Sequence, residues 1–511
     1  MKLEGSNPSN VSSSSAHAVP ASPFNVGSLA QLFVDRVLVR EARGIAFTLH
    51  PAEKHPDNPL VVADRPWESW RLESYGTVLH DEDDGIFKMW YWSPSSPGYA
   101  IGVEDVRQPL TLYATSEDGV KWEKPLVGTV PALRGDRFDH NVVATVLNAN
   151  VIKDKDDPDP DRRYKMICYR SVPKQSSGYH TMVSPDGLHW SELSTSPISP
   201  GRDVITGYYD DARGLYVAFP KIATTVRGHS RRVFYVITSE DFQHWTEPRL
   251  AFAPDLWDDA GSLHRLEEVR PILDVPDAPE LMRTEFYGVG VYLAESCTIA
   301  FPWVFTINND ARYGNHEGPI ELQLAASRDL SSWERHFRIP CVPRSEPGEW
   351  DCGINFTPAQ ALRVGDEIWL YYDGSTYTHG TPCVYRAEGT GQGTEHTASI
   401  GLAKWKLDRF VSADGSADGG MLTTVPIVFS GERLEINALT KRGGTITVEL
   451  LDAAGSPMNS FPPSNPFTGD NLRGVVTWPD GGGGVGRFIG KPVTLRFHLR
   501  DAELYSFAFR E

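Results

Sequence analysis

The chain has 511 residues, and at about 150 residues per domain this length predicts two to four folded units. Its 49 Lys and Arg residues are outnumbered by 67 Asp and Glu residues, which gives a net charge of −18. Such an acidic surface repels phosphate backbones and anionic headgroups, so we expect neither a nucleic acid nor a membrane as a partner.

Cysteine usage and the first residues of the chain bear on the compartment. The five Cys are scattered, odd in number and without a CxxC pair, so a disulfide framework is not expected. Residues 1–28 are rich in Ser, Pro and Ala, lack the apolar stretch of a secretory signal, and are expected to form a flexible leader. No apolar run is long enough to span a bilayer. A reduced, cytoplasmic location is therefore expected.

A short turn closed by Trp occurs four times with the same spacing. Ser stands two residues before Asp, and Trp follows six residues after the Ser, in the segments Ser116–Trp122, Ser184–Trp190, Ser239–Trp245 and Ser327–Trp333. Ser and Asp side chains cap the backbone of tight turns, and a Trp at the end supplies an apolar plug. Four copies with identical spacing indicate a structural repeat.

Hairpins form the second repeated signal. Five pairs of short apolar strands, each joined by an acidic or Gly-containing turn, begin near residues 75, 148, 203, 285 and 355. Most are followed by a further strand and a Trp-closed turn, which makes five four-stranded units. We therefore predict an all-β chain with a five-bladed β-propeller over residues 29–414, rather than an array of β-sandwiches. Residues 28–50 are expected to supply the strand that closes the ring.

After residue 414 the pattern changes. Alternating strands separated by Gly-rich turns predict a C-terminal antiparallel β-sandwich over residues 415–511, joined to the propeller by the linker at residues 412–420.

Acidic residues recur at the starts of the predicted first strands. Because a propeller brings these strands to one central axis, polar residues there are expected to converge. The candidates are Asp64, Glu68 and Glu73 in unit one, Asp139, His140, Asn141 and Asn150 in unit two, Asp203 in unit three, Glu285 in unit four and Asp351 in unit five. Two carboxyls with divergent pKa values are what cleavage of a glycosidic bond requires.

Taken together, these features resemble the five-bladed β-propeller glycosidases, a group that includes invertases, inulinases, levanases, arabinanases and β-xylosidases. The resemblance covers residues 30–511 in architecture and implies a furanose-type or related neutral oligosaccharide or glycoside as substrate. In those families an acid of blade one is nucleophile or base, an Asp of blade two orients the substrate or tunes pKa values, and a Glu of a later blade is the general acid. The chain lacks the W-M-N-D-P-N-G, R-D-P and E-C motifs of the fructosidases, so a divergent branch is implied.

The roles expected from this reasoning are specific. Glu285 is the expected general acid because its apolar neighbours Phe286 and Tyr287 favour a raised pKa, with Asp203 or Asp351 as nucleophile or base. The residues expected to bind the sugar are Asp64, Arg65, Trp67, Glu68, Asn141, Asn150, Trp350 and His379.

Two other functions remain open at this point. A glycoside phosphorylase needs a cationic cluster, for which Arg65, Arg202, Arg270 and His379 are available, and a carbohydrate-binding propeller needs no convergent acids. We expect no catalytic metal and no cofactor, because the His residues show no HxH or HExxH spacing. The acidic run at residues 154–163 resembles a calcium loop in charge but lacks EF-hand spacing, so a solvated hairpin tip is favoured over a structural calcium site.

Overall fold

The computed structural model describes residues 22–95, 109–131, 138–170, 177–193, 196–382, 384, 396–458, 461–479 and 484–511. These residues divide into two units. Pro51–Leu293 and Cys297–Leu407 form the propeller unit, whereas Met1–His50, Ala294–Ser296 and Asp408–Glu511 form the terminal unit. None of the described helices is long and apolar enough to cross a membrane.

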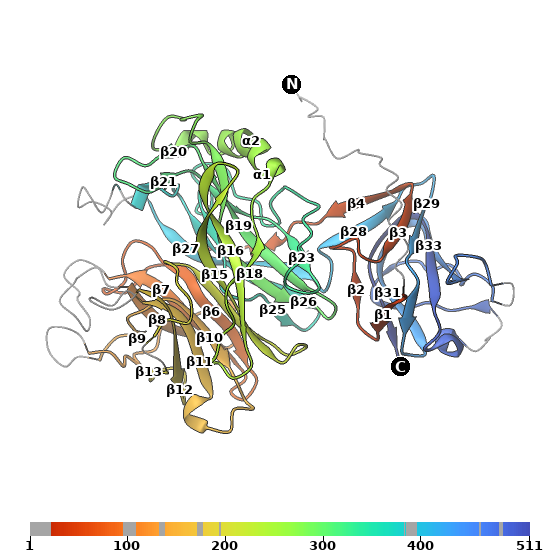
Figure 1. Ribbon diagram of the computed structural model, residues 1–511, viewed down its shortest axis with the longest axis horizontal. Coiled ribbons are helices and arrows are strands. Elements are labelled where there is room, and N and C mark those ends of the chain that lie inside the picture. Colours follow the sequence, from red (N-terminus) through yellow and green to blue (C-terminus); the bar gives the residue numbers. More distant parts are fainter. Residues whose placement is uncertain are drawn as a thin grey trace. The chain divides into compact units, whose positions relative to one another are not determined.

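The propeller unit consists of five antiparallel sheets in chain order, which confirms the predicted fold (Figure 1). Blade one contains β6 (Glu73–Asp81), β7 (Ile86–Pro94), β8 (Pro109–Ser116) and β9 (Val142–Ala144). Blade two contains β10 (Leu147–Lys153), β11 (Tyr164–Arg170), β12 (Gly178–Ser184) and β13 (Ser191–Glu192). Blade three contains β14 (Ile205–Asp210), β15 (Leu215–Val226), β16 (His229–Ser239) and β17 (Arg249–Phe252).

The last two blades depart from the regular four-stranded pattern. Blade four contains β18 (Arg283–Leu293), β19 (Thr298–Ile307), β22 (Ile320–Leu322) and β23 (Ala325–Ser327), with the small pair β20 (Asn309–Asp310) and β21 (His316–Glu317) beside it. Blade five contains β24 (Asn355–Phe356), β25 (Leu362–Val364), β26 (Glu367–Ser375), β27 (Ala398–Lys406) and β5 (Glu53–Lys54). Two short helices, α1 (Leu256–Ala260) and α2 (Ser262–Glu267), and two 3-10 turns, η1 (Pro160–Arg162) and η2 (Arg270–Ile272), complete the unit.

The first strands of neighbouring blades lie against one another, which defines the centre of the ring. Contacts join β6 to β10, β10 to β14, β14 to β18, and β24 to β6. Next to β24, the backbone of Ala359 links the first strands of blades four and one. Its carbonyl oxygen accepts a hydrogen bond from the N–H of Val291 in β18, and its N–H donates to the carbonyl oxygen of Gly76 in β6. Residues at the starts of the first strands are thereby brought together.

The strand that closes the ring differs from the expectation. We expected residues 28–50 to close it, but β5 does so, pairing Glu53 with Lys404 and Lys54 with Ala403 in blade five. Residues 39–49 form β3 (Val39–Arg43) and β4 (Ile45–Leu49), which pair with β29 (Gly420–Thr424) and β28 (Val411–Gly415). The alternating pattern of residues 28–50 predicts extended backbone, and β3 and β4 are extended. Their hydrogen bonds, however, are made to strands of the terminal unit.

The four Trp-closed turns share one hydrogen-bonding pattern. In each, the Asp carboxylate accepts hydrogen bonds from the Ser hydroxyl and from two following backbone N–H groups. The residue after the Asp has a positive φ in all four copies, and two of these residues are Gly. Each Trp then packs into the apolar cluster between its own blade and the preceding one, blade five preceding blade one.

The terminal unit is a region of mostly antiparallel strands around its own apolar core. Its longest strands, β31 (Arg433–Asp452) and β33 (Val493–Arg510), pair along most of their length. The strand β32 (Asp470–Val475) pairs with β31 in antiparallel orientation. The strands β1 (Phe24–Gly27), β2 (Gln31–Leu32) and β30 (Ile427–Phe429) and the 3-10 turn η4 (Val485–Phe488) complete it. Its core includes Phe429, Phe497, Phe507 and Phe509. It therefore takes in residues near both ends of the chain, not only the expected 415–511.

We predict that Asp118→Ala lowers the free energy of unfolding by about 1 kcal/mol, because Asp118 accepts three hydrogen bonds in the first Trp-closed turn. Urea-induced unfolding followed by Trp fluorescence measures this. The neighbouring Glu117 is exposed, so Glu117→Ala is the matched control and should leave the unfolding midpoint unchanged. Equal midpoints for both variants would contradict a stabilising role for the turn.

Candidate active site

A group of charged and aromatic side chains gathers where the first strands begin, and we call it the central cluster. Glu73 opens β6, Asp203 lies two residues before β14, and Glu285 is the third residue of β18. Neighbouring segments add cations and rings. The central cluster consists of Arg71, Glu73, Asp203, Lys221, Arg232, Glu285, Tyr287 and His379.

Asp203 is an ionised carboxylate in this cluster. Its Oδ2 accepts hydrogen bonds from Lys221 Nζ at 2.8 Å and from the Tyr287 hydroxyl at 3.0 Å. Burial opposes its ionisation, but Lys221 and the Tyr287 hydrogen bond outweigh burial and lower the pKa of Asp203. The side chain is still 33% exposed, and its backbone has the strained φ of 71°, a feature that tends to occur at functional sites.

Glu73 has the opposite character. Burial, together with the negative charge of Asp203, raises the pKa of Glu73, and the ion pair with Arg71 offsets this only in part. Arg71 Nη2 lies 2.6 Å from Glu73 Oε1. The other oxygen, Oε2, is buried and has no hydrogen-bond partner among the described residues. A buried polar atom in that state is costly unless a ligand satisfies it.

Glu285 differs from both because guanidinium groups engage its two oxygens. Arg283 Nε donates to Oε1 at 2.9 Å, and Arg232 Nη1 donates to Oε2 at 2.6 Å. The backbone N–H of Arg232 also donates to Oε2 at 3.3 Å. Two cations lie over the Tyr287 ring. Lys221 Nζ is 4.0 Å from the ring centroid, and the guanidinium carbon of Arg232 is 5.4 Å from it.

His379 completes the cluster as a neutral imidazole. Burial and the nearby Arg232 lower the pKa of His379 to about 3. Its ring centroid lies 4.9 Å from that of Tyr287 and 4.6 Å from that of Phe305, and its Nδ1 is 2.8 Å from the carbonyl oxygen of His316.

Glu317 fixes the loop that carries His379. It accepts hydrogen bonds from the Thr378 hydroxyl and, at 2.6 Å, from the Gly380 N–H. Burial raises the pKa of Glu317 to about 7. The side chain is buried, so its proton state is coupled to the stability of the fold.

Asp351 and Trp350, both expected at the site, take part instead in an ion-paired group of blade five. Asp351 Oδ2 binds Lys54 Nζ at 2.6 Å and the Tyr372 hydroxyl at 2.8 Å, and Trp350 packs against the Tyr372 ring. Asp351 is fully buried, and its side chain binds Lys54 and Tyr372 of blade five rather than members of the central cluster. The role of nucleophile or base expected for Asp351 is therefore not favoured by its position.

The blade-one candidates form a separate hydrogen-bonded group. Glu68 binds Lys124 Nζ at 2.8 Å and the Tyr91 hydroxyl at 2.7 Å, and Asp64 binds the same Lys124 at 2.7 Å. Asn141 accepts from Trp67 Nε1 at 2.7 Å and donates to the Tyr91 hydroxyl at 2.8 Å. Arg65 lies at the edge of the group, 3.7 Å from Asp64.

Asn150 has a structural role at the junction of blades two and three. Its amide nitrogen donates to the carbonyl oxygens of Ile167 and Ile205, and its amide oxygen accepts from the Gly207 N–H. These contacts occupy both ends of the amide. Of the residues expected at the site, the structure thus brings together Asp203, Glu285 and His379.

The sequence pattern does not assign a role to four residues of the central cluster, namely Arg71, Glu73, Lys221 and Arg232. Arg71 and Glu73 follow the unit-one candidates Asp64 and Glu68 along the chain, and the sequence pattern assigns no catalytic role to Glu73. Lys221 and Arg232 lie on the second and third strands of blade three, where the expectation of first-strand residues did not reach. The available signal was a single Lys after the apolar run of residues 215–220.

No group of three His, Cys, Asp or Glu suited to a metal ion occurs among the described residues. In the acidic run at residues 154–163, Asp154 and Asp157 each bind Lys165 Nζ at 2.7 Å. The Lys165 ammonium therefore already binds two of the carboxylates that a calcium ion would need as ligands.

Comparison with solved structures finds similarities to propeller enzymes. A thermostable family-43 glycoside hydrolase matches with a TM-score of 0.43 and 13% identity, over 70% of this chain and 95% of that one. A β-1,2-mannobiose phosphorylase from Listeria innocua matches with a TM-score of 0.43 and 11% identity, over 70% and 97%. An N-acetylgalactosamine deacetylase from F. plautii matches with a TM-score of 0.40 and 14% identity, over 72% and 96%.

No protein-family model and no curated protein sequence matches the chain. Likenesses at these identities and TM-scores carry no argument about chemistry, so the function has to be inferred from the side chains of the central cluster.

We predict that Glu317→Gln changes how stability depends on pH. In the unfolded chain this Glu titrates near 4.5, whereas its folded pKa is about 7, so its stabilising contribution is complete below pH 4.5 and is lost as the pH rises to about 7. Urea unfolding at pH 5 and pH 7.5 should show the wild-type protein losing about 2–3 kcal/mol more than the variant. The exposed Glu82 supplies the control Glu82→Gln, which should follow the wild type, and a Glu317→Gln protein that also follows it would refute the raised pKa.

Proposed function

We propose that the chain is a glycoside hydrolase whose acid–base pair is Glu73 and Asp203. The observation that carries this proposal is the pair of opposite pKa shifts in two electrostatically coupled carboxyls, with the pKa of Glu73 raised and that of Asp203 lowered. Pairs of titratable groups whose environments separate their pKa values are typical of acid–base catalysis.

Each carboxyl has a definite part in the reaction. The protonated Glu73 donates its proton to the leaving glycosidic oxygen, which satisfies the otherwise unpartnered Oε2. The ionised Asp203 acts as nucleophile toward the anomeric carbon or as base toward a water, and Lys221 and Tyr287 hold it in the charged state. Activity requires Asp203 ionised and Glu73 protonated, so the rate falls both below the pKa of Asp203 and above that of Glu73.

The geometry favours Glu73 over Glu285 as the proton donor. Both oxygens of Glu285 already accept hydrogen bonds from guanidinium groups, so this carboxyl is suited to orienting Arg232. Trp70, half-buried and beside the Tyr377 ring at 5.2 Å, supplies an aromatic surface of the kind on which sugar rings stack. The substrate we propose is an oligosaccharide or glycoside of furanose or related neutral sugars, as the sequence resemblance implies.

A glycoside phosphorylase is the second candidate, and one observation favours it. Lys221 and Arg232 lie next to Asp203 and Tyr287, and two adjacent cations are suited to binding a phosphate acceptor. A carbohydrate-binding protein without catalytic activity is less favoured. Two buried carboxyls and a third, partly buried one in the same place are costly to desolvate, and binding of sugar hydroxyls does not need them.

Replacing the proposed proton donor should lower activity strongly. On a panel of 4-nitrophenyl furanosides and pyranosides and the matching oligosaccharides, Glu73→Gln should reduce kcat about 10²–10⁴-fold for poor leaving groups and less for nitrophenolate, which needs no proton. Asp203→Asn should reduce the rate with both kinds of leaving group.

Asp351 provides the matched control for this experiment. It is also a fully buried carboxyl, but its side chain binds Lys54 and Tyr372 of blade five. Asp351→Asn should keep wild-type kinetics. If Glu73→Gln also kept them on a confirmed substrate, Glu73 would not be the donor.

Phosphate dependence separates the two enzyme proposals. A hydrolase should release free sugar at the same rate with or without inorganic phosphate, whereas a phosphorylase should require phosphate and release a sugar phosphate. Ion chromatography of the products, with sulfate as the control anion, measures this. Formation of a sugar phosphate would replace the hydrolase proposal by the phosphorylase one.

A further inference from the structure

Two cations of the central cluster are carried by a hairpin that projects beyond its sheet. β15 and β16 pair as far as Val226 and His229, around a two-residue turn at Arg227 and Gly228 with φ of 54° and 83°. β14 pairs with β15 only as far as Pro220, and β17 pairs with β16 only from Phe234. We call residues 221–232 the ribbon. Outside its turn, each residue of the ribbon has a single strand partner, and a two-stranded hairpin alone is only marginally stable.

The two faces of the ribbon have different contacts. Arg232 pairs with Ala223, so it shares a face with Ala223 and with Lys221 two residues before it. That face meets the central cluster, where Arg232 binds Glu285 and Lys221 binds Asp203. Arg231 is on the opposite face, is almost fully buried, and donates to the Val226 carbonyl oxygen within the ribbon.

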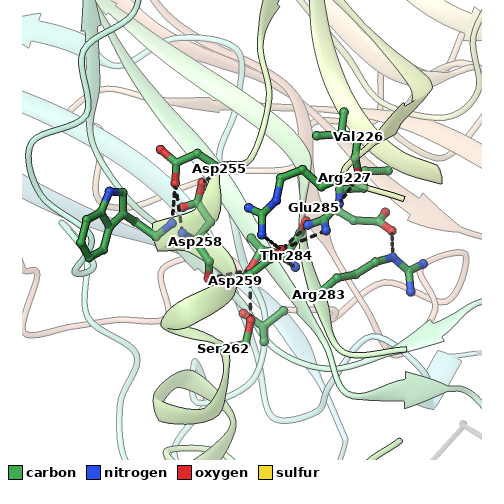
Figure 2. Close-up of polar contacts among 12 residues, drawn as sticks. Val226, Arg227, Asp255, Asp258, Asp259, Ser262, Arg283, Thr284 and Glu285 are labelled. Atoms are coloured by element: carbon green, nitrogen blue, oxygen red, sulfur yellow. Dashed lines mark hydrogen bonds and ion pairs between the residues drawn. The ribbon is translucent and has the colours of Figure 1, made fainter. Parts of the chain in front are cut away.

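Asp259 of helix α1 receives Arg231. Nη1 and Nη2 of Arg231 donate to Asp259 Oδ1 and Oδ2 at 2.7 and 2.9 Å, in a two-point ion pair. Arg227 Nη2, at the ribbon turn, lies 3.1 Å from Oδ2. Asp259 Oδ1 also accepts from the backbone N–H of Thr284 at 2.9 Å, and Figure 2 shows Asp259 between the ribbon and the strand of Thr284 and Glu285.

We propose that Asp259 is a positioning residue of the active site, which acts through Arg231 and Thr284 to place Lys221 and Arg232 against Asp203 and Glu285. The proposal rests on the function proposed above. One carboxylate holds two elements that each bring a charged member of the cluster: the ribbon, with its cations, and the start of β18, with Glu285. Asp259 itself has no contact with a reacting atom in this scheme.

Loss of the Asp259 charge has a defined consequence for the site. Without Asp259, Arg231 keeps its hydrogen bonds to the carbonyl oxygens of Thr284 and Val226, at 2.8 and 3.0 Å. Its buried positive charge then has no carboxylate to balance it, which favours release of the ribbon into water. Lys221 and Arg232 then leave the cluster together. The titratable and charged groups that face Asp203 are Lys221, Arg232, Glu73, His379, Tyr287, Tyr75 and Tyr179. Lys221 and Arg232 are the cations that favour its ionised form, so losing both raises the pKa of Asp203 and shifts the acid limb of the pH profile to higher pH.

Asp258 is the matched control on the same helix. Its side chain is fully buried and binds Arg335 and Arg338 at 2.9 and 3.0 Å, so Asp258→Asn also removes a buried ion pair of α1. These arginines lie outside the ribbon and outside the central cluster. A general loss of stability is therefore common to both variants, whereas an effect on the ribbon is expected only for Asp259→Asn.

Hydrogen–deuterium exchange tests the ribbon without requiring a substrate. In Asp259→Asn, amides of residues 221–232 should exchange at least about tenfold faster than in the wild type, and in Asp258→Asn they should not. Arg231→Gln should reproduce the change, and the double variant should add little to it. Ribbon exchange equal in Asp259→Asn and wild type would overturn the proposal, and so would the same acceleration in Asp258→Asn.

Kinetics tests the link to the active site. With the substrate identified in the aryl-glycoside screen, Asp259→Asn should lower kcat/KM by about 10²-fold and move its acid limb to higher pH, as Lys221→Met should. An unchanged acid limb despite a loosened ribbon would overturn the positioning role. A wild-type protein inactive on every glycoside, with and without phosphate, would refute the proposed function, while hydrogen exchange would still decide whether Asp259 fixes the ribbon.

Discussion

Every blade of the propeller unit is buried on both faces, because each packs against a neighbour on either side. Polar side chains inside the blades therefore need hydrogen-bond partners within the protein. The four repeated Trp residues fill the junctions at the outside of the blades, where Trp122 and Trp333 pack against rings such as Tyr371 and Phe219 of the preceding blade. The starts of the first strands, by contrast, come together at the centre of the ring. Charged groups placed there share one small region of low dielectric, and their charges have to be balanced within it.

The central cluster achieves this balance by a different arrangement for each acid. Glu285 binds two guanidinium groups, and Asp203 binds an ammonium and accepts a hydrogen bond from a phenol. Glu73 retains one oxygen that has no partner among the described residues. The acids therefore differ in environment although all three are carboxyls at strand starts. Tyr287 links them, because its hydroxyl binds Asp203 while its ring lies under Lys221 and Arg232. A site of this kind depends on the elements that deliver the cations as much as on those that carry the acids.

The sequence predicted the repeat well and the site less completely. Hairpin turns and Trp spacing are local signals, so the five blades and the positions of Asp203 and Glu285 could be inferred from them. The pattern of a polar residue at a strand start was less specific. Asn150, Asn141 and Asp351 share it, yet they bind neighbouring backbone, Trp67 or Lys54 within and between blades. Lys221 and Arg232 enter the cluster only because a hairpin outruns its sheet, and strand length is among the properties least fixed by local sequence. The closing strand was misassigned because alternation shows that a segment is extended but not which edge it joins.

The short strand β5 has a consequence for how the chain is made. It pairs with β27, so Glu53 meets Lys404 across roughly 350 residues of sequence. At about 5–20 residues per second, a ribosome needs about 20–70 s to synthesise the intervening chain. Throughout that interval the edge of β5 is exposed without the strand it will join, and blades one to four have to hold their order without a closed ring. The last blade therefore sets the time at which the whole propeller is first complete, and a nascent chain that stops before β27 presents an open sheet edge to chaperones.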